Sequence, residues 1–238
     1  MQTAAERVIR AAGAAISARG RFDWALSGGS TPAALYRVLA SRGYVERIDW
    51  SRVHFYWSDE RCVPPEHADS NFRMAREALL DAISPPASHV HRLAGELPPA
   101  TAAEQYELEL AQAFAVAPGS GFPAFDLILL GMGADGHTAS LFPGTPALEE
   151  RRRWIVANDV ASLGATRLTF TLPLINAARA ALFLVAGADK AERLEQVLGR
   201  RARPPLPAEL VRPLGDDADW LVDTAAGARL GPPSEERS

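Results

Sequence analysis

The feature that most constrains the fold of this chain is a series of short apolar runs, each of which ends in a polar or glycine-rich turn. The clearest runs span residues 22–26, 52–57, 125–130 and 181–185. Near-continuous apolar runs of this length are typical of strands that are buried on both faces of a sheet. Segments with apolar residues at helical spacing lie between the runs, and strands that alternate with helices indicate a parallel sheet. We therefore expect an α/β fold with a mostly parallel central sheet and helices on both of its faces.

The remaining elements follow from apolar periodicity and from turn residues. Helices are expected over residues 4–18, 33–42, 71–82, 102–115 and 190–198, and further strands over residues 154–158, 167–171 and 220–222. Pro32 suits the first turn of the second helix, with Ser30 or Thr31 as its N-cap. Residues 58–70 are interpreted as a polar loop and residues 231–238 as a frayed tail.

Length and composition limit the classes of protein to which the chain can belong. The 238 residues contain no repeat and no long linker, so we expect one domain over residues 1–238. Hydrophobic residues make up 47% and charged residues 23%, which excludes a mainly disordered chain or a collagen. A net charge of −4 provides no basic field for nucleic acid. The single cysteine, Cys62, excludes an internal disulfide and a multi-cysteine zinc site.

The sequence also bears on location. No apolar stretch approaches the ~20 residues that a membrane span requires. The first residues lack the basic region and the apolar run of a signal peptide. We therefore expect a soluble, cytoplasmic protein that does not bind a membrane.

Four polar segments accompany the predicted strands, and ligands of open α/β sheets bind beyond the carboxyl ends of the strands. The first is a Ser-Gly-Gly-Ser-Thr-Pro turn over residues 27–32, between a strand and a helix. Its glycines let backbone amides approach an anion, and the helix N-terminus adds partial positive charge, so phosphate is the natural ligand. A plain strand-to-helix turn is an equally good interpretation of this segment alone, because it is neither a Walker loop nor G-x-G-x-x-G.

Charged side chains make up two more of these segments. Asp59, Glu60 and Arg61 directly follow a strand and suit a sugar hydroxyl or a phosphate, although a solvated charged loop is the more common meaning of so short a run. Arg167 opens a predicted strand, and Lys190, the one lysine among 25 basic residues, opens a predicted helix. Both side chains suit phosphate, arginine as a planar bidentate donor and lysine as a point charge. The alternative interpretation is that they are two ordinary surface charges.

The remaining segment, Gly-Met-Gly-Ala-Asp-Gly-His-Thr over residues 131–138, follows the clearest strand of the chain. Its glycines permit a tight turn that projects Asp135 and His137 from the sheet edge. Histidine is the side chain best suited to move a proton near neutral pH, and a nearby carboxylate fixes its tautomer. A turn with an exposed histidine is the alternative, but the glycine density and the strand context favour a functional role. The other histidines are interpreted as structural: His54, His67, His89 and His91.

Taken together and in this order, five segments resemble the 6-phosphogluconolactonase family, which is related to the glucosamine-6-phosphate isomerases and deaminases. The matching segments span residues 26–32, 57–64 with 69–71, 130–143, 167–169 and 187–190. Each motif alone is modest, whereas five in order are highly specific, and the resemblance covers residues 5–225, nearly the whole chain. It implies the Rossmann-like fold of that isomerase and deaminase family.

The resemblance implies an enzyme that hydrolyses 6-phospho-D-glucono-1,5-lactone to 6-phospho-D-gluconate in the oxidative pentose phosphate pathway. It implies that His137 is the general base that activates water. Asp135 then orients His137 or holds a substrate hydroxyl, and Asp59 assists. The residues implied to hold the substrate phosphate are Gly28, Gly29, Ser30, Thr31, Arg61, Arg167 and Lys190. A lactone is an activated ester, so we expect no covalent nucleophile, no cofactor and no metal, with backbone amides of residues 131–133 as candidate oxyanion donors.

Two alternatives remain. The deaminase branch has an aspartate base where Asp59 stands, a bulky aromatic where Arg61 stands and a glutamate shortly after the histidine, whereas here no acid follows His137 before Glu149. Both departures favour the lactonase. A sugar-phosphate-sensing domain of a regulator normally carries a DNA-binding helix-turn-helix, and the roughly twenty residues before the first strand are too few for one. The expected partner is the small-molecule substrate, made by glucose-6-phosphate dehydrogenase without a required stable complex.

Overall fold

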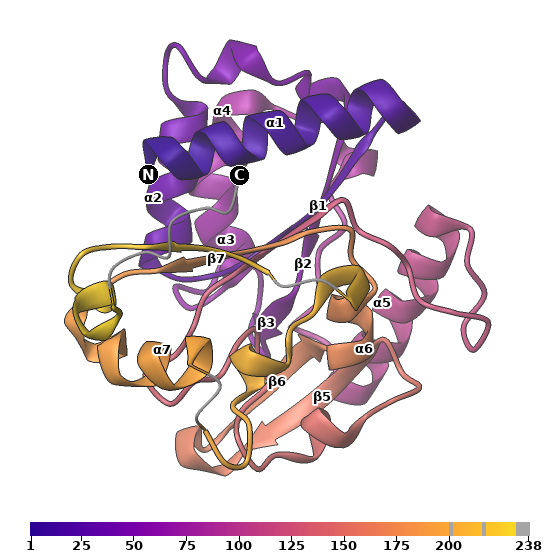
Figure 1. The fold of residues 1–238 in the computed structure, drawn as a ribbon. Helices are drawn as coiled ribbons and strands as arrows, with labels where there is room; N and C mark the ends of the chain where they lie inside the picture. Colours follow the sequence, from indigo (N-terminus) through magenta and orange to yellow (C-terminus); the bar gives the residue numbers. More distant parts are fainter. Residues whose placement is uncertain (200–201, 216–217, 232–238) are drawn as a thin grey trace.

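The computed structural model describes residues 1–199, 202–215 and 218–231, and Figure 1 shows how the elements are arranged. The tail predicted over residues 231–238 lies outside the described residues, apart from Gly231. No helix in the described ranges is long and apolar enough to cross a membrane.

The larger sheet has five strands, all parallel, in the order β2-β1-β4-β7-β8. Its strands are β1 (Phe22–Leu26), β2 (Val53–Trp57), β4 (Leu127–Leu130), β7 (Ala181–Val185) and β8 (Asp219–Val222). Every residue of β1, β4 and β7 is buried, as a parallel sheet covered on both faces requires. The predicted α/β fold with a mostly parallel sheet is confirmed.

Three further strands form a separate antiparallel sheet in the order β3-β6-β5. These strands are β3 (Asp59–Arg61), β5 (Ile155–Val160) and β6 (Ala165–Phe170). The strands predicted near residues 154–158 and 167–171 therefore exist, but they pair with each other outside the parallel sheet. The prediction of a loop over residues 58–70 is wrong at β3, because pairing with β6 extends a charged segment that has no strand pattern of its own.

Ser58 connects the two sheets. Its amide donates a hydrogen bond to the carbonyl of Leu26 at 3.0 Å, and its carbonyl accepts one from the amide of Phe170 at 2.8 Å. The same residue is thus bonded to β1 on one side and to β6 on the other. One cluster of buried side chains also runs through both sheets, with Trp24 and Trp154 as members. The loops at the junction of the sheets therefore rest on a common close-packed core.

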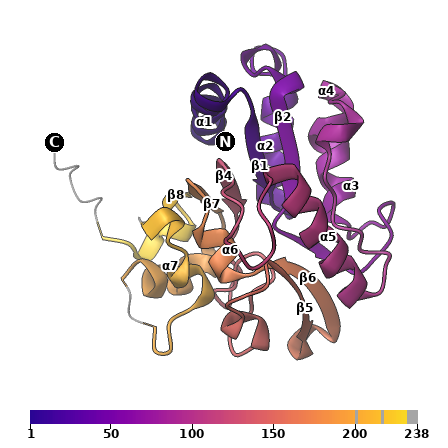
Figure 2. The ribbon, with the colours of Figure 1, turned by 90° about the vertical axis from the view of Figure 1, so that its right-hand side faces the viewer.

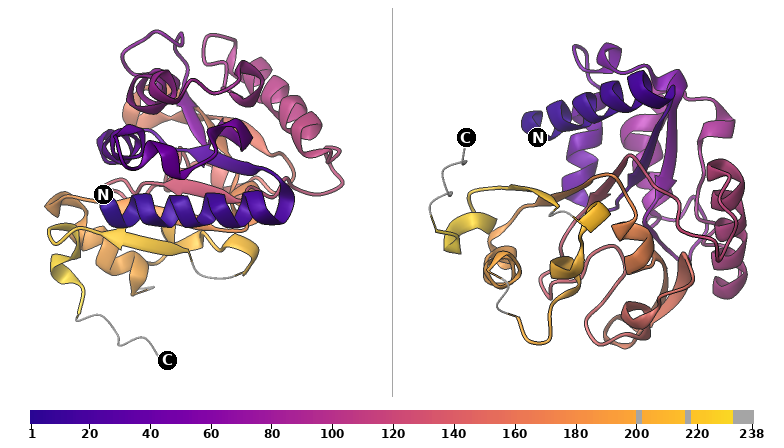
Figure 3. Two further views of the ribbon diagram at one scale, coloured as in Figure 1. Left: turned by 90° about the horizontal axis from the view of Figure 1, so that it is seen from above. Right: turned by 45° about the vertical axis from the view of Figure 1, so that its right-hand side comes forward.

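Helices lie on both faces of the parallel sheet, and Figures 2 and 3 show α1 and α5 on opposite sides of β1 and β2. The helices are α1 (Gln2–Arg19), α2 (Ser30–Ala40), α3 (Asn71–Ala75), α4 (Asp81–Ile83), α5 (Pro99–Phe114), α6 (Leu172–Asn176) and α7 (Ala191–Leu198). A π-helical turn, Arg76–Leu80, joins α3 to α4. The N-cap of α2 is Gly29, with φ of 102° and no side-chain cap, so the prediction of Ser30 or Thr31 as N-cap is wrong. Helix α2 consequently begins three residues before the predicted position.

Candidate active site

The parallel sheet has a topological switch between β1 and β4. The chain runs from β1 outward to β2 and later returns to place β4 on the other side of β1. Such a switch point, beyond the carboxyl ends of the strands, is where open α/β sheets bind ligands. Here the turn after β1 and the turn after β4 line one cleft of about 540 Å³. The predicted site residues that line it are Gly28, Gly29, Asp59, Arg61, Asp135, His137, Arg167 and Lys190.

The cleft thus brings together eight of the ten residues selected from the sequence. The other two, Ser30 and Thr31, form the first turn of α2 and do not line the cleft. Asn71, Ser140, Phe142 and Ser162 also line it, although sequence reasoning assigned them no role.

His137 and Asp135 form a hydrogen-bonded pair in the turn after β4. Oδ1 of Asp135 lies 2.6 Å from Nδ1 of His137 and also accepts the His137 amide at 3.1 Å. Burial opposes ionisation of Asp135, but its hydrogen bonds with His137 outweigh that effect and hold its pKa at about 2. A carboxylate only accepts hydrogen bonds, so Nδ1 of His137 carries the proton. The carboxylate therefore contacts His137, and the lone pair of the neutral imidazole is on Nε2, for which no hydrogen-bond partner is found within the described ranges.

Two neighbours define the position of the His137 ring: Gly133, which the sequence suggested only as a turn glycine and a candidate oxyanion donor, and Phe142, to which it assigned no role. A Cβ atom on Gly133 would lie 2.1 Å from Nδ1 and 2.2 Å from Cε1 of His137, so only glycine leaves room for the imidazole. On the other side the Phe142 ring stacks on the imidazole, with centroids 4.1 Å apart and an interplanar angle of 27°. The Gly133 amide donates to the His137 carbonyl at 2.9 Å, which removes that amide from the candidate oxyanion donors.

The acids of β3 serve different purposes, because alternate residues of a strand point to opposite sides. Asp59 is 7% exposed and faces the cleft. Its Oδ2 accepts the Ser140 hydroxyl at 2.7 Å, and Nδ2 of Asn71 donates to its carbonyl at 2.9 Å and lies 3.4 Å from its Oδ1. Asn71 in turn packs on Gly28, where a Cβ would lie 1.8 Å from Oδ1 of the amide. Gly28 is thus required for close packing on Asn71.

Glu60 has a structural role at the start of α3. Its carboxylate accepts the amides of Asn71 at 2.7 Å and Phe72 at 2.8 Å, together with the Ser70 hydroxyl at 3.0 Å. Burial raises the pKa of Glu60, and these hydrogen bonds act against that rise. A carboxylate at this position satisfies amides that the helix itself leaves unpaired.

Three cations line the cleft: Arg61, Arg167 and Lys190. Arg61 and Arg167 are directly opposite each other in the ladder between β3 and β6, an arrangement that like charges disfavour unless an anion lies between them. Nη1 of Arg61 donates to the carbonyl of Asp69, which holds that side chain in place. Nζ of Lys190 lies 2.9 Å from Oδ2 of Asp189, and this hydrogen bond lowers the pKa of Asp189. Both arginines and Lys190 line the cleft that holds His137.

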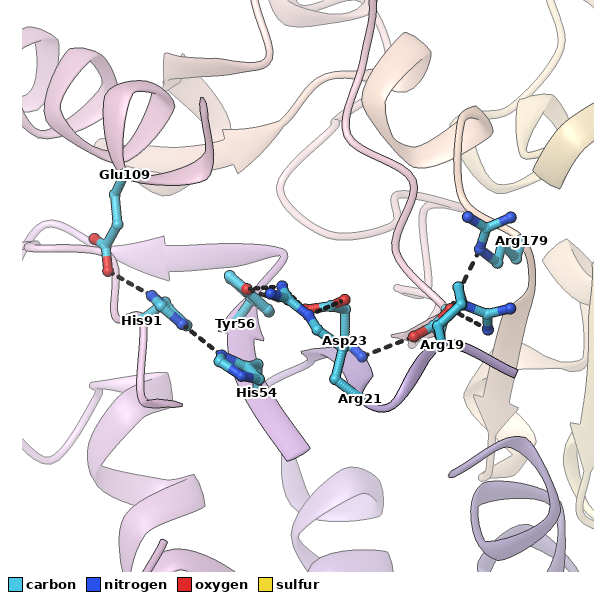
Figure 4. Close-up of polar contacts among 9 residues, drawn as sticks. Arg19, Arg21, Asp23, His54, Tyr56, His91, Glu109 and Arg179 are labelled. Atoms are coloured by element: carbon cyan, nitrogen blue, oxygen red, sulfur yellow. Dashed lines mark hydrogen bonds and ion pairs between the residues drawn. The ribbon is translucent and has the colours of Figure 1, made fainter. Parts of the chain in front are cut away.

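Three of the four histidines assigned to structural roles gather at the opposite end of the sheet, as Figure 4 shows for His54 and His91. His54 stacks on His89 at 4.0 Å, and its Nδ1 lies 3.2 Å from Nε2 of His91. Nδ1 of His91 lies 2.8 Å from a carboxylate oxygen of Glu109. The fourth, His67, lies in the polar loop and its Nδ1 accepts the amide of Asp69 at 3.2 Å.

The cleft is not the largest hollow of the molecule. A hollow of about 990 Å³ lies between the segment around Pro146, helix α7 and the segment around Pro204. None of the ten predicted site residues lines it, whereas Glu149 does. We assign function to the smaller cleft because a histidine–carboxylate pair and three cations converge there. In the part of the chain that the structure describes, no group of three His, Cys, Asp or Glu side chains is arranged to hold a metal ion.

Comparisons with known proteins agree with this geometry. The family model described as glucosamine-6-phosphate isomerases/6-phosphogluconolactonase matches residues 1–220. The 6-phosphogluconolactonase of Synechocystis sp. is 47% identical over 220 residues, which are 92% of this chain and 88% of that protein. The human 6-phosphogluconolactonase is 40% identical over 234 residues, which are 96% of this chain and 88% of that protein.

Solved structures give the same result. The crystal structure of 6-phosphogluconolactonase from Thermotoga maritima superposes with a TM-score of 0.80 at 32% identity, covering 93% of this chain and 94% of that one. A monomeric glucosamine-6-phosphate deaminase, at 21% identity and a TM-score of 0.77, shares the fold. From the sequence match, the superposition and the cleft at the switch point, this chain belongs to the glucosamine-6-phosphate isomerase/6-phosphogluconolactonase family.

Proposed function

We propose that this chain is a 6-phosphogluconolactonase, which hydrolyses 6-phospho-D-glucono-1,5-lactone to 6-phospho-D-gluconate. The observation that carries the proposal is one cleft with a histidine base at one place and an opposed arginine pair at another. Such a cleft suits a substrate with an electrophilic carbonyl at one end and a phosphate at the other. The names of relatives up to 47% identical support the same substrate.

The proposed reaction begins at Nε2 of His137. The lone pair of Nε2 accepts a proton from water as the water oxygen bonds to the lactone carbonyl carbon. Asp135 stabilises the positive charge that develops on the imidazole. When the tetrahedral intermediate collapses, the bond from the carbonyl carbon to the ring oxygen breaks, and the imidazolium returns its proton to that oxygen. No covalent bond to the protein is needed.

The phosphate of the substrate binds at the far side of the same cleft. Arg61 and Arg167 offer planar donors to its oxygens, and Lys190 adds a point charge. The amides at the N-terminus of α2, beside Gly28 and Gly29, add the partial positive charge of the helix. An anion there relieves the repulsion between the opposed arginines, so binding and local stability are coupled.

The residues of the cleft favour hydrolysis over isomerisation and deamination. The carboxylates that line it are those of Asp59 and Asp135, as judged from the described residues. Glu149, the first acid after His137 in the sequence, lines the larger hollow instead. A second acid beside His137, as ring opening of an amino sugar requires, is therefore not provided. Asp59 is assigned the role of accepting a substrate hydroxyl.

A coupled assay tests the proposal. Glucose 6-phosphate and its dehydrogenase generate the lactone in place, and 6-phosphogluconate dehydrogenase reports the product as NADPH. The expected result is a second NADPH step that rises with added protein above spontaneous opening at the same pH. No rise, combined with turnover of glucosamine 6-phosphate, would overturn the proposal in favour of deamination. A cytoplasmic location and a metabolic link to the dehydrogenase without a stable complex belong to the same proposal.

A further inference from the structure

We propose that Phe142 is a positioning residue for the reaction, and that the face of its ring stabilises the positive charge that His137 acquires as it takes the proton of water. This inference rests on the proposed function, because it concerns the base of that reaction. Phe142 has no role in the reaction steps described above.

The geometry restricts the His137 ring on three sides. The Phe142 ring stacks on the imidazole with centroids 4.1 Å apart, a Cβ on Gly133 would overlap Nδ1 and Cε1, and Oδ1 of Asp135 holds Nδ1 at 2.6 Å. These neighbours restrict rotation of the imidazole about its side-chain bonds. His137 lines the cleft, and among the described residues Nε2, the atom that must accept the proton, has no hydrogen-bond partner.

Phe142 is a buried side chain that also lines the cleft. It is 7% exposed, yet it is absent from the contiguous cluster of core side chains formed by the described residues. Its backbone is fixed by the turn that follows, in which the Phe142 carbonyl accepts the Thr145 amide at 3.2 Å and the Thr145 hydroxyl at 2.8 Å. A buried aromatic ring that lines the cleft and is held over a histidine by a hydrogen-bonded turn points to a role in the site.

The chemistry follows from the charges around His137. Arg61, Arg167 and Lys190 line the same cleft and oppose a further positive charge on the imidazole, while Asp59 and Asp135 favour it. Phe142 is the neutral neighbour in direct ring contact. The face of a phenyl ring is electron-rich, and a cation within about 6 Å of its centroid is attracted to it. The attraction is greater for the imidazolium than for the neutral ring, so it lowers the barrier for the proton transfer.

The test replaces the aromatic ring of Phe142 with a smaller apolar side chain. In Phe142→Leu we expect kcat to fall roughly 3- to 10-fold, with KM within about two-fold of the wild type. Because the imidazolium loses stabilisation, the midpoint of the acidic limb of the kcat profile moves to lower pH. Phe142→Trp, which keeps an electron-rich face, is expected to restore both quantities toward the wild type. Phe114→Leu, which removes an aromatic contact at the opposite end of the sheet, is the matched control and should leave kcat unchanged.

Two further measurements separate stabilisation of the imidazolium by Phe142 from simple packing. Trifluorophenylalanine at position 142 preserves the ring shape and weakens the electron-rich face, and it should reproduce the fall in kcat if Phe142→Leu does not fold. The NMR titration of the His137 Cε1 proton should show the same displacement to lower pH without any turnover. If kcat falls but neither midpoint moves, Phe142 only packs, and the inference is overturned. If the wild type does not hydrolyse the lactone but the NMR midpoint still moves, the proposed function fails while the charge stabilisation stands.

Discussion

The two ends of the parallel sheet each hold a histidine that is hydrogen-bonded to a carboxylate, but only one of these pairs faces a cleft. At the carboxyl end, His137 and Asp135 lie 2.6 Å apart and Nε2 of the histidine points away from the carboxylate. At the other end, His91 and Glu109 lie 2.8 Å apart, and Nε2 of His91 is already bonded to His54. Both pairs join Nδ1 of a histidine to a carboxylate. They differ at Nε2, which is hydrogen-bonded in His91 and has no hydrogen-bond partner among the described residues in His137.

The two pairs also differ in whether the cations at the same end of the sheet have anionic partners. Figure 4 shows that the cations at this end of the sheet already have anionic partners: Arg21 pairs with Asp23, and Arg19 and Arg179 both pair with Asp126. At the cleft, two arginines face each other across a ladder. A histidine–carboxylate pair therefore indicates a site only where its free nitrogen and unneutralised charge remain available to a ligand.

The largest expected effect comes from exchanging the two histidines for glutamine, one at a time. His137→Gln should lower kcat for the lactone by roughly 10²–10⁴-fold, because the base is lost. His91→Gln should keep kcat within about two-fold. It should lower the free energy of unfolding by roughly 1–3 kcal/mol, because Glu109 and His54 lose a partner. The coupled assay and urea unfolding measure the two quantities, and equal losses of kcat would break the comparison.

The next largest effect on kcat is expected from a substitution at Gly133, with a substitution at Gly13 as its control. Gly133→Ala places a methyl group 2.1 Å from Nδ1 of His137, so the ring must move, and a displacement of about 1 Å costs roughly 10²-fold in rate. Gly13→Ala, in α1, meets nothing within 4 Å and should instead stabilise the helix by about 0.5–1 kcal/mol with unchanged kcat. Normal kcat in Gly133→Ala would show that the ring position is not critical.

Lys190→Ala tests the charge at the far wall of the cleft. We expect KM for the phosphorylated lactone to rise roughly 10- to 100-fold, because the loss of a charge-assisted hydrogen bond lowers the binding free energy by a corresponding amount. Hydrolysis of unphosphorylated gluconolactone is the internal control and should change little. Equal losses on both substrates would assign Lys190 to folding or to chemistry rather than to phosphate binding.

The smallest effect is a pH dependence of stability at the histidine stack. Burial, then the charge of Arg21 and then His89, lower the pKa of His54 from 6.5 to about 4. The unfolded chain therefore binds more protons between these values, so stability is full above about pH 6.5 and falls as the pH drops toward about 4. We expect a loss of roughly 1–2 kcal/mol, after allowance for screening of a partly buried ring.

The measurement is urea unfolding at about pH 7 and about pH 5, for the wild type and for His54→Gln. The variant should lose less stability than the wild type between the two conditions. If both lose the same amount, other groups carry the pH dependence.

Several elements could be predicted because local sequence and tertiary structure agree there. Strands β1 and β7 have the predicted bounds, since each is a buried, mostly apolar run that is followed within two residues by glycine or serine. Asp59, Arg61, Asp135, His137, Arg167 and Lys190 were selected because charged side chains at strand ends meet at one sheet edge. The order of these motifs carried the resemblance to a known family, and the resemblance in turn implied the activity and the roles of the individual residues.

Other features could not be predicted because they depend on partners distant in the sequence. Strand β3 is charged and extended only through its pairing with β6. Gly133 and Phe142 lie in the matched segment 130–143, but their contacts with the His137 ring depend on the folded turn and could not be predicted from the sequence. The stacking of His54 on His89 and His91 depends on a loop that lies beside β2, where the His91 amide donates to the carbonyl of Phe55 at 2.9 Å.

Ser58 has a consequence for substrate choice. One residue is bonded to β1 and to β6 at the same time, so main-chain hydrogen bonds connect the wall with the turn after β1 to the wall with the arginines. We therefore expect the span between the proposed phosphate position and Nε2 of His137 to change little when a ligand binds. We expect a sugar phosphate that is one carbon shorter or longer to keep its phosphate between the arginines while its carbonyl lies out of register with the base. On this expectation, the main-chain hydrogen bonds of a single serine contribute to the selection of ligands by their length.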